Sequence, residues 1–254
     1  MVALAASLFV LSTLFALLER GAASVPRQSI FRRERLTDFL WWFVTPTATK
    51  AISSIAVVVA ITTLGVATGF SPSHFQSQNT VVQILELLIA ADLLGYWSHR
   101  LFHRGVLWRF HAVHHSAKDL DWLAAARVHP LNEVLSRLLQ FVPLYVLGFR
   151  GEALAAAVPF LTFYAIFVHA NLKWDFGPLR YVIASPRFHR WHHTSQEEGL
   201  DKNFAGLFPW IDLLFGTFYM PRGRQPEKFG VAGESVPDGI IGQLAYPFRA
   251  RRVL

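Results

Sequence analysis

The stretch TVVQILELLIAADLLGYWSHRLFHRGVLWRFHAVHH, residues 80–115, joins an apolar segment directly to five histidines. Residues 80–97 carry only two charged side chains, and their number approaches the about 20 apolar residues that a helix needs to cross a bilayer. His99 and His103 follow four residues apart, so both rings lie on one helical face where the segment leaves the membrane. The stretch therefore predicts a membrane helix that ends in a histidine cluster.

The composition of the whole chain agrees with this prediction. Of 254 residues, 53% are hydrophobic and only 16% are charged, whereas a soluble domain carries roughly a quarter charged residues. The formal net charge is nonetheless +7. An apolar but basic chain favours a membrane protein with one positive face over a nucleic-acid-binding protein. The absence of cysteine excludes disulfides, cysteine-ligated zinc, iron–sulfur clusters and a cysteine nucleophile.

Hydropathy predicts an all-α integral membrane bundle with four or five spans and a histidine-rich helical cap. The apolar segments are residues 2–18, 51–70, 80–97, 134–147 and 153–168. The last two, separated by a short turn, predict a helical hairpin. Residues 2–18 lack the positive flank of a signal peptide, which favours a retained anchor over a cleaved one.

The chain divides into two predicted parts. Residues 1–79 hold the first two spans and a basic loop, in which Trp41, Trp42 and Phe43 predict an aromatic belt at the membrane interface. Residues 80–254 hold the histidines and form the predicted catalytic domain, except that His74 lies in the loop before it.

The distribution of cations predicts the orientation of the chain. Residues 19–50, 98–132 and 170–254 contain 22 of the 24 lysines and arginines. Because cytoplasmic loops carry the excess of positive charge, these segments are expected in the cytoplasm and the N-terminus outside. Ten of the eleven histidines fall on the same side, and His74 lies alone on the other. No nucleic-acid-binding module accounts for that arrangement.

Two copies of a His-x-x-His-His pattern carry the chemistry. HAVHH at 111–115 and HRWHH at 189–193 have spacings that direct two rings to one metal ion and the third ring to another. Neutral imidazole is the commonest metal ligand, so the clusters predict two metal ions. His129 and His169 stand alone. A lone histidine near a membrane interface is more often a hydrogen-bonded structural residue, so both interpretations stay open for these two.

The surroundings of the histidines narrow the chemistry. Nitrogen-rich sites suit zinc, copper, iron and nickel. The His-Glu-x-x-His motif of zinc proteases and the Glu-x-x-His pairs of soluble di-iron bundles are both absent. No acid lies within a histidine cluster to act as a hydrolytic general base. By elimination, an imidazole cage favours oxygen activation over hydrolysis.

The order of motifs resembles the fatty acid hydroxylase/sterol desaturase superfamily. The resemblance runs from about residue 80 to the end of the chain, and it rests on HRLFH (99–103), LWRFHAVHH (107–115), ARVHP (126–130), FVHANL (167–172) and SPRFHRWHHT (185–194). Asn203 and the segment WIDLLFGT (210–217) continue it. The resemblance implies a membrane di-iron oxygenase that attacks an unactivated C–H bond of a lipid with O2.

The resemblance also implies ligands and partners. The implied metal ligands are His99, His103, His111, His114, His115, His189, His192 and His193, with His129 and His169 as additional ligands. The implied cofactors are two iron ions, with zinc an alternative in purified protein. Because the chain has no flavin, haem or nucleotide motif, the electrons are expected from a separate reductase or a ferredoxin- or cytochrome-type donor.

Two acids are candidate catalytic residues. Asp92 lies seven residues before His99 on the same helical face and is a candidate to orient an imidazole through its second nitrogen, or to bond a neighbouring helix. Asp212 is a candidate for the same role, or for a local cap.

Other functions stay open beside lipid hydroxylation. A desaturase or a carotenoid- or sterol-modifying oxygenase would use the same histidine cage. A membrane metal-binding or transport protein is the alternative of another class, but it predicts ligands along the spans and on both sides of the membrane.

Overall fold

The computed structural model describes residues 1–26, 28–69 and 78–249, and the described part contains helices joined by loops. The α-helices are α1 (Val2–Ala22), α2 (Arg35–Thr68), α3 (Thr80–Phe102), α4 (Gly105–His115), α5 (Pro130–Leu147), α6 (Gly151–His169), α7 (Pro186–His192), α8 (Trp210–Leu214) and α9 (Ile240–Ala245). Short 3-10 turns are η1 (Trp122–Ala126), η2 (Gly177–Tyr181), η3 (Glu197–Gly199) and η4 (Tyr246–Phe248). His74, expected in the outer loop, lies outside the described residues.

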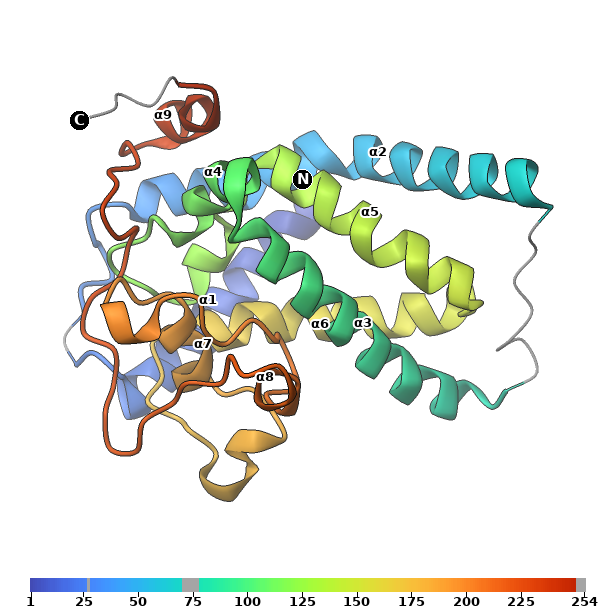
Figure 1. The fold of residues 1–254 in the computed structure, drawn as a ribbon. Coiled ribbons are helices and arrows are strands. Elements are labelled where there is room, and N and C mark those ends of the chain that lie inside the picture. Colours follow the sequence, from blue (N-terminus) through green and yellow to red (C-terminus); the bar gives the residue numbers. More distant parts are fainter. Residues whose placement is uncertain (27, 70–77, 250–254) are drawn as a thin grey trace.

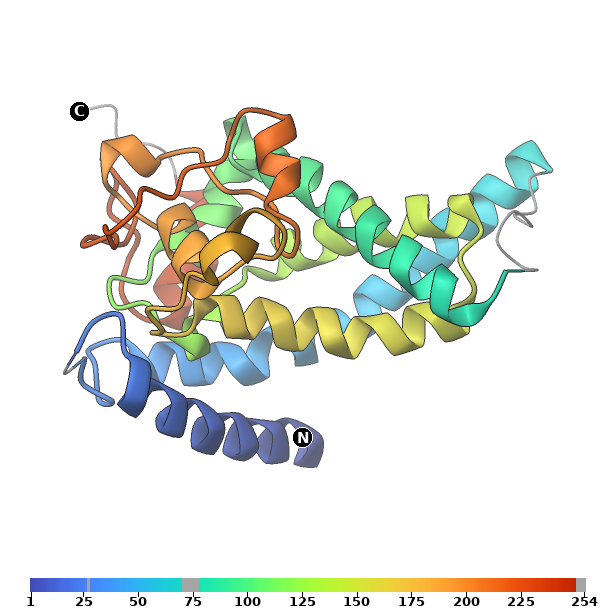
Figure 2. The ribbon, with the colours of Figure 1, turned by 90° about the horizontal axis from the view of Figure 1, so that it is seen from below.

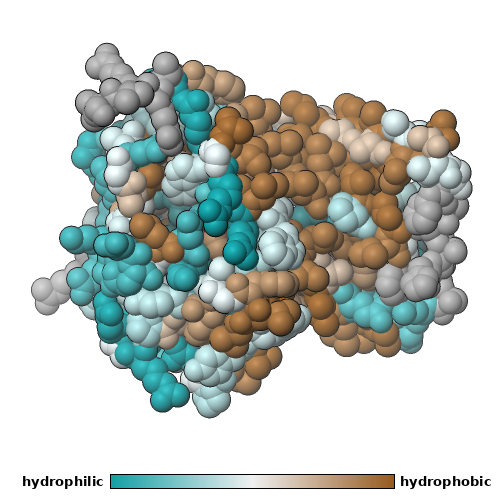
Figure 3. All heavy atoms as spheres, viewed as in Figure 1, coloured by the Kyte–Doolittle hydropathy of each residue, from teal (hydrophilic) through white to brown (hydrophobic). Residues whose placement is uncertain are grey.

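Four helices are long and apolar enough to cross a membrane: α1, α2, α3 and α6. The long helices α2, α3, α5 and α6 extend together in one direction, and the short helices gather at the other end (Figure 1, Figure 2). In the space-filling view, hydrophobic residues predominate over the part formed by the long helices, with a few hydrophilic residues at its far tip, and hydrophilic residues gather over the opposite end (Figure 3). The predicted all-α bundle with a helical cap is confirmed.

Helices α5 and α6 are joined by the predicted short turn, and both pack on α3. Gly148 ends α5 in the left-handed conformation with φ of 91°, and its N–H donates to the carbonyls of Leu144 and Tyr145. Glycine takes this conformation without the steric cost that a Cβ brings, which explains the sharp turn. The α6 helix is among the four candidate spans, whereas α5 is not.

The basic loop before the second span differs from the prediction. Helix α2 already begins at Arg35 and runs through Pro46, so the aromatic residues lie on a helix. Trp41 and Trp42 are buried and do not form an interfacial belt. The Nε1–H of Trp41 donates to Gln243 Oε1 at 2.7 Å, and Trp42 contacts the ring of Trp122. The prediction was wrong because residues about 80 and 200 positions later along the chain cover these side chains.

The N-terminal helices pack on the histidine-bearing part of the chain. Phe15 of α1 stacks on Trp122 of η1 with ring centroids 5.4 Å apart. Phe15 and Trp42 share one buried apolar cluster with Trp122 and Leu172. Burying a large apolar side chain contributes about 1.5–3 kcal/mol, so this cluster ties α1 and α2 to the loops around the histidines.

Candidate metal centre

The ends of four helices bring nine histidines together. Helix α3 carries His99 and ends at His103, its C-cap. Helix α4 follows at once and carries His111, His114 and His115, while His169 is the last residue of α6. Helix α7 carries His189 and His192 and ends at His193, its C-cap. Its start is set by Ser185, whose hydroxyl accepts from the Phe188 N–H at 3.2 Å, and by a proline in the first turn.

The nine rings divide into two groups. The five-histidine cluster consists of His99, His103, His111, His115 and His192, and the four-histidine cluster consists of His114, His169, His189 and His193. Within each group, one ring nitrogen per residue lies within 4.8 Å of all the others. The two groups adjoin, because the rings of His115 and His193 stack with centroids 4.4 Å apart.

Ring nitrogens within each cluster lie at short distances from one another. In the five-histidine cluster, His111 Nε2 lies 3.0 Å from His99 Nε2 and 3.2 Å from His115 Nε2. In the four-histidine cluster, Nε2 separations of 3.1–3.2 Å join His114 to His169, His169 to His189, and His189 to His193.

The hydrogen bonds of the Nδ1 atoms determine which ring nitrogen faces the centre of each cluster. Six of the rings donate their Nδ1–H to an acceptor outside the cluster. The pairs are His99 with the Phe204 carbonyl (2.9 Å), His103 with Asp201 Oδ1 (3.0 Å), His111 with Asn132 Oδ1 (3.1 Å), His114 with the Arg127 carbonyl (3.1 Å), His169 with the Ala165 carbonyl (2.6 Å) and His192 with the Lys202 carbonyl (2.8 Å). These acceptors hold the proton on Nδ1, so each Nε2 presents a lone pair.

The arrangement fits a metal ion in each cluster. The lone pairs of His99 and His111 face each other, and so do those of His114 and His169, which is repulsive unless a cation lies between them. Nitrogens about 2.1 Å from a common ion and at right angles to one another are about 3.0 Å apart, which matches the Nε2 separations. The acceptors on Nδ1 are the outer partners that metal-bound histidines need.

Burial keeps these imidazoles in the neutral form that binds metals. The pKa values of His111, His114 and His115 lie well below the ordinary histidine value, first because burial disfavours the charged ring and then because neighbouring rings repel a second charge. The same two causes lower the pKa values of His192 and His193. Metal binding therefore does not have to displace protons from these rings at neutral pH.

The two lone histidines have different positions. His169 lies in the four-histidine cluster, whereas His129 lies in neither cluster. His129 caps α5: its Nδ1 accepts from the Leu131 N–H at 3.2 Å, and its Nε2–H donates to the Leu244 carbonyl at 3.2 Å. Both nitrogens of this ring therefore have partners, and the structural alternative accounts for it.

Asp92 and Asp212 hold one loop beside the five-histidine cluster. Asp92 accepts from the N–H groups of Gly206, Leu207 and Phe208 at 2.7–3.0 Å, and Asp212 accepts from those of Phe204 and Ala205 at 2.8–2.9 Å. Their recorded partners are therefore loop groups rather than the imidazoles that were expected. Their effect on His99 is indirect: they hold the loop in which the Phe204 carbonyl accepts from His99 Nδ1–H.

Sequence reasoning missed two side chains that contact the rings directly. Asp201 accepts from His103, and Asn132 accepts from His111. Asn132 follows the predicted His129 by three residues, close to one helical turn, and Asp201 follows the last histidine pattern by eight. Neither spacing identifies a contact with a ring on another element, so the sequence held no distinctive signal for them.

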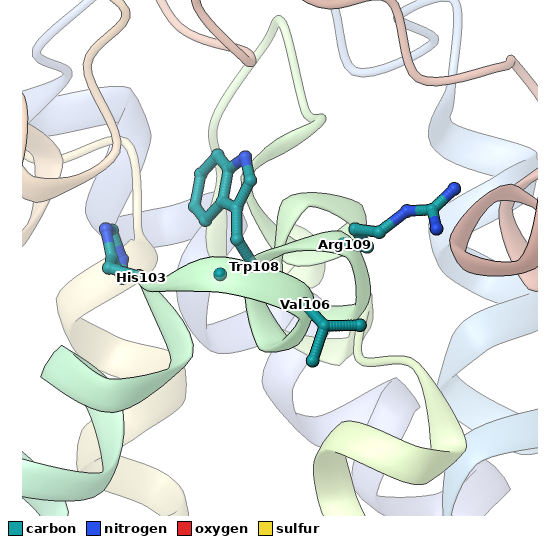
Figure 4. A pocket seen from close by; sticks show the side chains of 5 residues that line it. His103, Val106, Trp108 and Arg109 are labelled. Atoms are coloured by element: carbon teal, nitrogen blue, oxygen red, sulfur yellow. The ribbon is translucent and has the colours of Figure 1, made fainter. Parts of the chain in front are cut away.

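A cavity borders the five-histidine cluster, and no member of the four-histidine cluster lines it. It has a volume of about 230 Å³, and its lining includes His103, His115, His192, Trp108 and Leu200. An adjoining hollow of about 460 Å³ is lined by His103, Gly105, Val106, Trp108 and Arg109. In Figure 4 the ring of Trp108 stands between His103 and the extended side chain of Arg109.

Comparison with known proteins agrees with the geometry. The family model described as fatty acid hydroxylase matches residues 84–217. The ornithine lipid hydroxylase OlsE of Rhizobium tropici is 34% identical over 69% of this chain and 54% of its own length. Human alkylglycerol monooxygenase is 30% identical over 51% of the chain and 29% of its own length, and an aldehyde decarbonylase of Oryza sativa subsp. indica is 29% identical over 66% and 28%.

The chain spans about half the length of the first of these relatives and under a third of the other two. No solved structure matches it. The matched region begins inside α3 and ends beyond α8, so it contains all nine clustered histidines together with Asp92, Asp201 and Asp212. On this match, the chain belongs to the fatty acid hydroxylase family.

Proposed function

We propose that the protein is a membrane-bound oxygenase that uses O2 and two iron ions to hydroxylate an unactivated C–H bond of a lipid. One observation carries this proposal: nine imidazoles gather in two adjoining groups at the polar end of helices that are apolar enough to span a membrane. Imidazoles whose free nitrogens all bind metal cannot act as general bases for hydrolysis. Bound iron would supply the O2 chemistry that amino-acid side chains lack.

The residues of the two clusters have assigned tasks in this proposal. The nine clustered histidines hold the iron ions through Nε2, and in six of them an Nδ1 acceptor keeps the ring in that tautomer. His129 is not assigned as a ligand. Asp92 and Asp212 are positioning residues that hold the loop whose Phe204 carbonyl orients His99. Asp201 holds His103 from the cavity side.

The substrate is a lipid in this proposal, and its target carbon enters the cavity beside His103, His115 and His192. Trp108 and Leu200 line that cavity, and their apolar surface contacts the acyl or ring carbons and excludes water. Two named relatives, an ornithine lipid hydroxylase and an alkylglycerol monooxygenase, support a lipid substrate. Positioning supplies selectivity because an apolar chain offers few polar handles.

The proposed reaction needs electrons from another protein. A reductase or a ferredoxin- or cytochrome-type donor docks on the polar end of the molecule (Figure 3). The segments that the sequence predicts for this side contain most of the lysines and arginines. The same excess of cations supports a cytoplasmic position for this end and an outside position for the N-terminus. An acidic donor would therefore meet a surface of opposite charge.

Purified, iron-loaded protein tests the proposal. After anaerobic purification and loading with Fe²⁺, we expect about two iron ions per chain by elemental analysis. Cells that produce the protein should contain lipids that have gained one oxygen atom, and cells that produce His192→Ala should not. Loss of two hydrogen atoms instead would identify a desaturase. Wild-type protein without metal, or iron-loaded protein without any O2-dependent change in lipids, would contradict the oxygenase.

The described spans carry their clustered histidines at one end only, in α3 and α6. A transport path would need ligands at several depths of the membrane. Protein reconstituted in vesicles distinguishes an oxygenase from a metal transporter. The oxygenase should retain its bound metal and move none across the vesicle membrane.

A further inference from the structure

A buried network of charged residues joins the start of α2 to the loop between α4 and α5. The ion network consists of Arg32, Glu34, Asp38, Asp121 and Arg127. Each of these residues is at most 8% exposed, and Asp38 and Arg127 are fully buried. Three of them precede the region that the family model matches, which begins at residue 84.

The contacts of the ion network alternate in charge. Arg32 donates to both oxygens of Asp121 at 2.7–2.8 Å and to Asp38 at 2.5 Å. Arg127 donates to Asp38 at 2.6 Å and to Glu34 at 3.1 Å. Asp38 therefore bridges the two arginines: one of its carboxylate oxygens accepts from Arg32 and the other from Arg127.

Arg127 links this network to the four-histidine cluster. Its backbone carbonyl accepts from His114 Nδ1–H at 3.1 Å, so the position of this residue determines how the His114 ring is oriented. Its guanidinium also donates to the hydroxyl of Ser116, two residues after His114, at 3.0 Å. The next residue is tethered as well, because the Thr45 hydroxyl of α2 donates to the Val128 carbonyl at 2.7 Å.

The chemistry of the network makes Asp38 the residue that positions Arg127. A buried guanidinium requires a charged partner, since desolvation of an unpaired charge is costly. Without the Asp38 carboxylate, Arg127 would keep only Glu34 at the longer distance and a neutral hydroxyl. We expect its side chain to move toward water and to carry its carbonyl away from His114.

We propose that the segment of residues 32–45 is a positioning element of the four-histidine cluster, in which Asp38 orients His114 through Arg127. This proposal rests on the proposed metal centre. It assigns a role toward the metal to a part of the chain that otherwise looks like a membrane anchor and its loop.

Titration of the metal-free full-length protein with Co²⁺, in detergent and without O2, tests this role. Wild type should bind two ions, and His114→Ala should identify the visible absorption band of the four-histidine cluster by its loss. We expect Asp38→Asn to weaken Co²⁺ binding at that same cluster by about 10–100-fold and to leave the other ion unchanged, as loss of an outer partner does. The control Asp238→Asn breaks the exposed pair with Arg33 on the same segment and should leave both bands unchanged.

The outcomes separate this proposal from the metal centre itself. A folded Asp38→Asn protein that binds two ions with wild-type affinity and spectrum, even with a lower melting temperature, would overturn the positioning role alone. If Asp38→Asn does not fold, Glu34→Gln decides, since it removes only the longer contact of Arg127: about fivefold weaker binding at the four-histidine cluster supports the role, and no change overturns it. Wild-type protein that binds no Co²⁺ would overturn both this role and the metal centre.

Discussion

The five-histidine cluster and the four-histidine cluster are built from the same side chain, but they differ in their access to solvent. All members of the four-histidine cluster are buried, whereas His99 and His103 of the other cluster are half-buried residues, although the His103 side chain itself is only 5% exposed. The cavity that Trp108 and Leu200 line touches three rings of the five-histidine cluster and none of the other.

The outer partners differ in the same way. The five-histidine cluster uses two side chains, Asp201 and Asn132, as acceptors besides backbone carbonyls. The recorded Nδ1 acceptors of the four-histidine cluster are carbonyls of Arg127 and Ala165. A carbonyl in a packed backbone is harder to move than an exposed carboxylate. The comparison indicates one cluster that borders a cavity and one that is buried.

The largest expected effect comes from two adjacent residues that serve different clusters. His192→Ala removes a ring from the five-histidine cluster and His193→Ala removes one from the four-histidine cluster. Each variant should bind one metal ion instead of two and lose lipid turnover by more than the about 100-fold that loss of an outer partner costs. Elemental analysis and product formation measure this. If either variant lost both ions, the two clusters would not be separate sites.

Removing the carboxylate of Asp201, which lines the cavity beside the five-histidine cluster, should have the next largest effect. Asp201 has φ of 54°, which glycine adopts without strain, so Asp201→Gly removes the acceptor of His103 with little disturbance of the backbone. Metal affinity should fall about 10–100-fold at the five-histidine cluster only. Glu227→Gln, at an exposed acid of a neighbouring loop, is the control. Equal weakening at both clusters would remove the distinction between them.

Narrowing the cavity should have a smaller effect. Leu200→Phe adds bulk to the lining beside Asp201 without touching a metal ligand. We expect kcat/KM for lipid oxidation to fall about tenfold while the metal content stays at the wild-type value. Leu179→Phe, at an exposed position of η2, is the matched control. Unchanged kinetics would indicate that the substrate reaches the metals by another route.

The smallest effect is expected at His129, which lies in neither cluster. His129→Ala should cost about 1 kcal/mol of stability through loss of the α5 cap, and His129→Asn should recover most of it because asparagine also caps helices. Both variants should bind the same number of metal ions as the wild type. Thermal unfolding and elemental analysis check this, and loss of one ion in both variants would make His129 a ligand.

Spacing within a helix accounts for part of how the rings are grouped. His111 and His115, and likewise His189 and His193, are four residues apart, and each pair lies in one cluster. The third ring of each pattern, His114 or His192, lies in the other cluster. The spacing allows such a pattern to serve two sites, and the structure pairs the rings that are four residues apart.

The pattern could not tell which lone histidine is a ligand. His129 and His169 each lie beside a helix end in the sequence, yet one caps a helix and the other completes a cluster. The difference arises because α6 ends where α4 and α7 converge, whereas the start of α5 faces the C-terminal helix through Leu244. The burial of Trp41 and Trp42 escaped prediction for the same reason, since distant segments cover them.

Composition and periodicity were enough to predict a helical membrane protein with a histidine-rich end, because hydropathy and ring spacing are properties of short segments. Long-range contacts decided how nine rings divide, which acids touch them and which cluster opens to a cavity. Asp201 contacts His103 across 98 residues, and Asp38 contacts Arg127 across 89. Such pairs form only when packing brings separate helices and loops together, so neither their partners nor their roles can be inferred from neighbouring residues.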